Sequence, residues 1–100
     1  MAPGTPAADL RVERIYVTGR VQGVGYRNFL AGEARALGLN GWVRNRADGA
    51  VEALVAGPLP FVDTLVKRAE QGPPRARVNA VRRALTDEHP PIGFFVAATI

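Results

Sequence analysis

A segment with two closely spaced glycines, Val21-Gln22-Gly23-Val24-Gly25-Tyr26-Arg27, constrains this chain more than any other part of it. It follows a strand-like run and precedes a helical one, so the backbone turns there through conformations that glycine adopts most readily. N–H groups in such a loop can converge on one point, and a helix N-terminus adds positive partial charge. Arg27 adds a full positive charge and a fork of donors. The segment predicts an anion-binding site for a phosphate or carboxylate group.

The two glycines alone do not establish such a site. Any turn between a strand and a helix requires residues that tolerate positive φ, so Gly23 and Gly25 fit a purely structural loop equally well. The segment matches neither the Walker phosphate loop nor the dinucleotide-binding fingerprint. Arg27 favours a functional interpretation, because a cation at the N-terminus of a helix opposes the helix dipole unless an anion is bound there.

The composition of the chain indicates one domain. The 100 residues are 47% hydrophobic and include no cysteine, which excludes disulfides, thiolate nucleophiles and thiolate zinc sites. We expect residues 10–100 to form the domain and residues 1–9, which are rich in Pro, Ala and Gly, to form a disordered leader. The chain has no apolar run of roughly 20 residues and no signal peptide. We therefore expect a cytoplasmic protein with no membrane partner.

Charged residues narrow the class of ligand without identifying it. The formal net charge of +4 suits anionic small molecules and also nucleic acid. His89 is the only histidine, and it lies in a loop-like segment where a solvated side chain is expected. Asp48 and Glu52 flank a predicted turn instead of pairing in a pocket, so we expect no metal site. No cofactor is implied.

The first half of the chain alternates between strand and helix patterns. Residues 10–18 indicate a strand, with a shift of parity near Glu13, and residues 28–38 have apolar residues at helical spacing. Residues 41–46 and 50–56 are strand-like and are joined by an Asp-Gly pair, which is typical of a hairpin. We expect the two strands to be antiparallel neighbours.

The second half repeats the alternation. Pro58 or Pro60 can begin a second helix, whose apolar stripe we expect to consist of Phe61, Leu65 and Ala69, widened by Val62 and Val66. Residues 76–85 indicate a strand with a bulge, because two of its valines differ in parity, and residues 94–98 indicate a last short strand.

The order of these elements is βαββαβ with a further strand near the end. Such an order fits an α+β fold, a two-layer ferredoxin-like sandwich with a mainly antiparallel sheet and two helices on one face.

A second segment adds an asparagine at the end of a strand, just before the predicted turn. This asparagine is Asn45 in Gly41-Trp42-Val43-Arg44-Asn45. An asparagine at such a position commonly serves only to form the turn, so the neighbouring motifs have to decide whether Asn45 has a function. Together with Val17-Thr18-Gly19-Arg20-Val21-Gln22-Gly23-Val24-Gly25-Tyr26-Arg27 and Asp48-Gly49-Ala50-Val51-Glu52, this segment resembles the two signatures of the acylphosphatase family. Tyr26 departs from the phenylalanine that is usual in the family and keeps the aromatic ring.

The resemblance implies hydrolysis of the carboxyl-phosphate mixed anhydride of small acyl phosphates, giving a carboxylate and inorganic phosphate. Arg27 matches the phosphate-binding arginine of the family, and Asn45 matches the asparagine that holds the attacking water. The loop of Gln22, Gly23, Val24, Gly25 and Tyr26 would supply backbone donors to the phosphoryl oxygens. The resemblance further implies a monomer. We expect phosphate or a similar anion to bind as product or inhibitor, and, because Asp48 and Glu52 do not pair in a pocket, we expect activity that needs no metal.

Two other functions remain open at this point. The same sandwich is widely used to bind RNA on its open sheet face, and a basic chain is compatible with that use. Residues 50–56 contain no aromatic residue, however, so the aromatic strand of RNA-binding domains is missing and nucleic acid is not the expected partner. The third interpretation is a regulatory module that binds an anion for a partner.

Overall fold

The structure is a computed structural model that describes residues 10–100. The expected leader at residues 1–9 lies outside the described residues. The strands are β1 (Leu10–Arg20), β2 (Asn40–Asn45), β3 (Val51–Pro58), β4 (Arg77–Leu85) and β5 (Phe94–Val96), and the helices are α1 (Tyr26–Ala36) and α2 (Leu59–Gln71). The predicted order of strands and helices is confirmed, with boundaries shifted by one or two residues.

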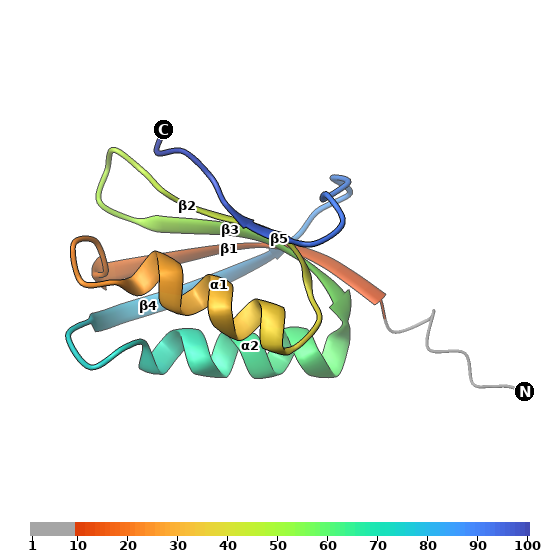
Figure 1. Ribbon diagram of the computed structural model, residues 1–100, viewed down its shortest axis with the longest axis horizontal. Helices are drawn as coiled ribbons and strands as arrows, with labels where there is room; N and C mark the ends of the chain where they lie inside the picture. The colour runs from red at the N-terminus through yellow and green to blue at the C-terminus, as the bar shows by residue number, and fades with distance from the viewer. Residues whose placement is uncertain (1–9) are drawn as a thin grey trace, which may run out of the picture.

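The strands form one sheet with the order β4-β1-β3-β2-β5. All neighbouring strands are antiparallel except β2 and β5, which run parallel. Both helices lie against one face of the sheet, and the other face is open (Figure 1). The α+β ferredoxin-like sandwich with a mainly antiparallel sheet is therefore confirmed. None of the helices described in residues 10–100 is long and apolar enough to cross a membrane.

The core lies between the sheet and the two helices. Alternate residues of the central strands point toward the helices, as the period of two in a strand requires. The fully buried members include Ile15 and Val17 of β1, Val51 and Val55 of β3, Leu30 of α1 and Leu65 of α2.

The expected shift of parity in β1 is wrong. Glu13 is buried on the same face as Ile15 and Val17, so the alternation continues without interruption. A carboxylate can occupy this inward position because Arg83 of β4 donates hydrogen bonds of 2.8 and 3.1 Å to its two oxygens. A buried charge requires a partner, and this partner comes from a strand 70 residues away in the sequence.

The buried face of α2 differs from the predicted apolar stripe at one position. Its buried residues are Val62, Leu65, Val66 and Ala69, whereas Phe61 is an exposed large hydrophobic residue. The expected bulge of β4 is confirmed, because the register with β1 shifts between Thr18 and Gly19.

The topology brings two distant segments to one end of the molecule. Because β1 and β2 are both antiparallel to β3, which lies between them, they run in the same direction and end at the same edge of the sheet. The glycine loop follows β1, and the turn at residues 46–50 follows β2. Figure 1 shows the two connections at the same end of the sandwich.

Candidate active site

A hollow of about 230 Å³ lies where the glycine loop meets the end of β2. Its lining comes from the loop, the first turn of α1 and the last residue of β2, and consists of Val21, Gln22, Gly23, Gly25, Tyr26, Arg27, Asn28 and Asn45. Arg27 and Asn45, which are 18 residues apart in the sequence, therefore face the same cavity.

The loop has the backbone conformation that glycine permits. Gly23 and Gly25 have φ values of 73° and 80°, in the left-handed region, and at either position no atom beyond the adjacent residues lies within 4 Å of where a Cβ would stand. The requirement for glycine is therefore one of backbone conformation and not of space. Gly25 precedes α1 and its carbonyl accepts the first helical hydrogen bond, from Phe29 N at 3.0 Å.

The N-terminus of α1 is electropositive. No side chain caps it, and its first turn contains no acidic residue. Within the described part of the chain, no backbone carbonyl accepts a hydrogen bond from the N–H groups of residues 23–28. The free N–H groups at the end of a helix carry partial positive charge and form an anion-binding position.

Arg27 adds a full charge beside these donors. The helix begins at Tyr26, two residues earlier than expected, so Arg27 lies in its first turn. Its guanidinium group donates a long hydrogen bond of 3.5 Å to the carbonyl of Ala97 in the segment after β5. Among residues 10–100, Arg27 forms no ion pair with a carboxylate. Its charge is thus left for a ligand in the hollow.

Asn45 presents an unpartnered amide oxygen to the site. It is the last residue of β2, and its backbone carbonyl accepts a hydrogen bond of 3.2 Å from Ile100 N. Its side-chain Oδ1 is buried and has no hydrogen-bond partner among the described residues. A buried acceptor without a donor costs roughly 1–3 kcal/mol, so a water or ligand donor is expected there.

Gln22 joins the two halves of the site. Its side-chain Nε2 donates hydrogen bonds of 2.8 Å to the carbonyl of Arg46 and 2.9 Å to that of Ala50. These carbonyls belong to the turn between β2 and β3, so the amide connects the glycine loop to the hairpin that carries Asn45. The sequence predicted Gln22 only as a member of the loop, and nothing local in the sequence indicates this connection.

The lining differs from the predicted set at three positions. Val24 was predicted as a loop residue, but it does not line the hollow and packs instead against the hydrophobic core. Val21 and Asn28 also line the hollow, although neither was predicted as a phosphate-binding residue. Val21 begins the segment predicted to bind an anion, and Asn28 directly follows it.

The remaining candidates lie elsewhere. His89 is exposed. Asp48 lies in the turn, where a hydrogen bond from Ala50 N and an ion pair with Arg46 lower its pKa. Residues 10–100 contain no cluster of three His, Cys, Asp or Glu side chains arranged to hold a metal ion. Glu52, expected to flank the hairpin, is fully buried on the open face of the sheet beneath arginines.

The arrangement can bind an oxyanion and hold a water beside it. Backbone N–H groups, a helix N-terminus and Arg27 stabilise negative charge, and the amide of Asn45 can accept and donate hydrogen bonds. Such a site favours reactions in which charge develops on phosphoryl oxygens.

Comparison with known sequences identifies relatives over most of the chain. A family model described as Acylphosphatase matches residues 13–96. An acylphosphatase of Rhodopseudomonas palustris is 54% identical over 70 residues, covering 70% of this chain and 71% of that protein. Acylphosphatase 2 of Ralstonia nicotianae is 54% identical over 87 residues, covering 86% and 92% of the two chains.

Solved structures show the same similarity. The acylphosphatase from Bacillus subtilis is 37% identical with a TM-score of 0.82, over 88% of this chain and 98% of that one. The structure of an acylphosphatase from Coxiella burnetii is 28% identical with a TM-score of 0.87, over 95% and 100%. The sequence match, the fold and the enzymes among its relatives agree, and the chain belongs to the acylphosphatase family of hydrolases.

Proposed function

We propose that the protein hydrolyses the carboxyl-phosphate mixed anhydride of small acyl phosphates in the hollow between the glycine loop and β2. The observation that carries the proposal is the meeting of Arg27, a row of free N–H groups and the unpartnered amide oxygen of Asn45 in one cavity. Family membership supports the same reaction.

The phosphoryl group occupies the loop. The N–H groups of the loop residues that line the hollow and of the α1 N-terminus donate hydrogen bonds to its oxygens, and Arg27 supplies the full positive charge. These donors are fixed by the left-handed glycines before the substrate arrives. Preorganised donors stabilise charge as it develops in the transition state, which is the main catalytic requirement of phosphoryl transfer.

Asn45 orients the attacking water. Its amide has no basic group at neutral pH, so it positions the water through the carbonyl oxygen and the NH₂ group without removing a proton. An acyl phosphate has a carboxylate as its leaving group, which departs without protonation by a strong acid. The proton of the water passes to the phosphate of the substrate itself, so the mechanism requires no general base from the protein.

Arg27 and the backbone donors provide the positive charge that a magnesium ion provides in many other phosphoryl-transfer sites. We therefore propose that hydrolysis needs neither a metal nor a cofactor. The hollow of about 230 Å³ and its mostly polar lining suit a phosphate with a small acyl group. We also propose that the protein acts as a monomer.

The open face of the sheet does not favour RNA binding. The guanidinium groups of Arg14 and Arg44 lie over the ring of Trp42, at 5.2 and 4.3 Å from its centroid, and that of Arg46 lies 5.1 Å from the centroid of Tyr16. Aromatic rings that are already covered by arginines offer little surface for stacking bases, on which single-stranded recognition depends.

The test is phosphate release from acetyl phosphate and benzoyl phosphate by the purified protein, with and without a chelator. Rapid release that the chelator leaves unchanged is expected. A folded protein that releases no phosphate would contradict the proposal. Strongly salt-dependent RNA binding in the same preparation would then favour the RNA-binding alternative, and binding of inorganic phosphate alone would favour the regulatory module.

A further inference from the structure

Glu52 of β3 is a carboxylate that the proposed reaction does not use. It is fully buried, and it lies on the face of the sheet opposite the helices. Arg44 donates to it at 3.0 Å from Nε and pairs with it at 2.9 Å through a terminal nitrogen, and Arg46 donates at 3.3 Å. Arg14 of β1 donates to its other oxygen. One buried carboxylate therefore binds three arginines, which come from β1, from β2 and from the turn between β2 and β3.

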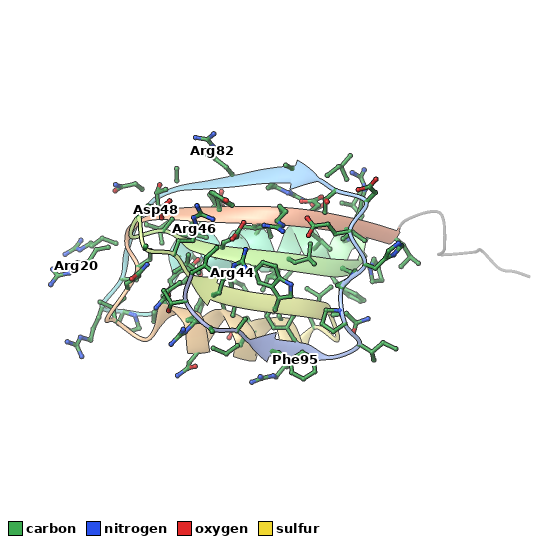
Figure 2. The ribbon with its side chains drawn as sticks, turned by 90° about the horizontal axis from the view of Figure 1, so that it is seen from above. Arg20, Arg44, Arg46, Asp48, Arg82 and Phe95 are labelled. Carbon is green, nitrogen blue, oxygen red and sulfur yellow. The ribbon has the colours of Figure 1, made fainter. Side chains whose placement is uncertain are left out.

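Two of these arginines flank Asn45 in the sequence. Arg44 and Arg46 lie over the open face of the sheet, which Figure 2 shows toward the viewer. Because side chains alternate along a strand, the side chain of Asn45 between them points to the other face, where the hollow lies. The pairing of Arg44 with Glu52 and of Asn45 with Val51 across β2 and β3 fixes the same register.

Arg46 is held from several sides at once. Its side chain contacts Glu52 and Asp48, and its carbonyl accepts the 2.8 Å hydrogen bond from Gln22 of the phosphate loop. A rotation of this residue would move the end of β2 and the connection to the loop together. Contacts on the face opposite the hollow therefore restrain the residue that directly follows Asn45.

Stability alone does not account for this cluster. Removing a carboxylate and guanidinium groups from water is costly, and a well-packed apolar group at such a position often stabilises a fold as much or more. The cluster holds the residues on both sides of Asn45, where β2 ends. The arginines are further restrained by packing over Trp42 and Tyr16.

We propose that Glu52 is a positioning residue for the hydrolysis, which keeps the amide of Asn45 directed at the phosphate loop by anchoring Arg44 and Arg46 on the opposite face of the sheet. The inference rests on the proposed function of Asn45 as the group that holds the attacking water. It adds a residue that never touches the substrate.

The test compares Glu52→Gln with Glu13→Gln. Glu13 is a matched control, because it is also a buried carboxylate bound by an arginine, but it lies on the helix-facing side of the sheet and is bonded to Arg83 of β4. For Glu52→Gln we expect kcat to fall on the order of 10- to 100-fold, because moving a group that positions a reactant by about 1 Å can lower the rate by up to about 100-fold. KM and the Kd for inorganic phosphate should change by less than about twofold, because Arg27 and the loop remain in place. Glu13→Gln should lose stability and keep its kcat.

Double variants show whether Glu52 acts through Asn45. In an Asn45→Ala background, Glu52→Gln should lower kcat no further, because the group that it positions is absent. An equal loss of kcat in both backgrounds, or an unchanged kcat in folded Glu52→Gln, would overturn the inference. If Glu52→Gln does not fold, Arg44→Gln replaces it, since the Arg44 side chain is 22% exposed and its loss is easier to accommodate.

A readout without turnover separates this inference from the proposed function. The side-chain NH₂ signals of Asn45 in NMR spectra should shift or broaden in Glu52→Gln, while those of Asn28, which lines the same hollow from α1, should not. Unchanged Asn45 signals would overturn the positioning role. A wild type that releases no phosphate would overturn the proposed function whatever the signals show.

Discussion

Gln22 and Arg46 are joined by a hydrogen bond of 2.8 Å from the side-chain amide of the first to the backbone carbonyl of the second. The same amide donates to the carbonyl of Ala50 at 2.9 Å. A single side chain therefore connects the loop that would hold the phosphate to the hairpin that would hold the water. This bridge adds to the strand pairing that brings the two segments to one edge of the sheet.

Replacing Gln22 by methionine should lower activity more than stability. Methionine has a similar length but no donor, so both hydrogen bonds are lost. The two carbonyls keep other donors, Gly49 N for Arg46 and Arg46 N for Ala50, so we expect a cost of only about 1 kcal/mol in the free energy of unfolding. We expect kcat/KM for acetyl phosphate to fall roughly 10- to 100-fold, because the phosphate and the water lose their alignment. Full activity in the folded variant would show that the bridge is not needed.

Replacing Gly25 by alanine tests the conformation of the loop. Alanine meets no atom there, but the left-handed conformation at φ 80° costs an L-residue roughly 1–2 kcal/mol. We expect a loss of that order in stability together with weaker binding of inorganic phosphate, measured by titration. Gly32→Ala is the control, because Gly32 lies inside α1 with free space around it, and alanine should stabilise the helix by about 1 kcal/mol. Equal effects of the two changes would contradict the role of the loop.

Replacing Tyr26 by phenylalanine should affect stability and leave turnover nearly unchanged. The buried hydroxyl of Tyr26 donates a 2.7 Å hydrogen bond to the carbonyl of Ala69 near the end of α2, and burial raises the pKa of this hydroxyl above its usual value. Without the hydroxyl, that carbonyl loses a donor in the core, and we expect a loss of about 1–2 kcal/mol in unfolding free energy. Denaturant unfolding measures the loss. A large fall in kcat would show that the hydroxyl takes part in the reaction.

Acidification should destabilise the protein through Glu52. Burial alone would raise the pKa of this carboxyl, but hydrogen bonds from Arg44, Tyr16 and Arg14 outweigh burial and hold it below its ordinary value of 4.5. The unfolded chain therefore binds the proton more tightly, and the stabilising effect is present above about pH 4.5 and is lost as the pH falls through the folded pKa. Thermal unfolding of wild type and Glu52→Gln between pH 7 and 3 should show a difference that narrows toward acid. A constant difference would contradict the assignment.

Much of the site was predictable because it depends on local rules and on topology. The glycine pair and Arg27 at the start of a helix indicate an anion site from the sequence alone. The hairpin at Asp48 places Asn45 at the end of a strand. Once the order of elements is known, the antiparallel pairing of both flanking strands with β3 brings these segments to one edge.

The features that the sequence did not predict depend on partners far apart in the chain. Glu13 suggests an outward-facing position until Arg83 is known to lie beside it. Likewise, nothing near Glu52 in the sequence shows that Arg14 of β1 reaches it, although the hairpin register places Arg44 and Glu52 on one face. Phe61 appears in the apolar pattern of α2, but its exposure is decided by where the helix lies on the sheet.

In the proposed reaction, Arg27 holds the phosphoryl group while Asn45 orients the attacking water. The most direct test is to measure phosphate release from benzoyl phosphate and the Kd for inorganic phosphate in Arg27→Ala and Asn45→Ala. Both variants should lose on the order of 10² to 10³ in kcat/KM, as removal of one preorganised donor does in other enzymes. Only Arg27→Ala should lose phosphate binding, and Asn45→Ala should bind phosphate as the wild type does. Nearly unchanged hydrolysis by folded Arg27→Ala would contradict the phosphate-binding role of Arg27.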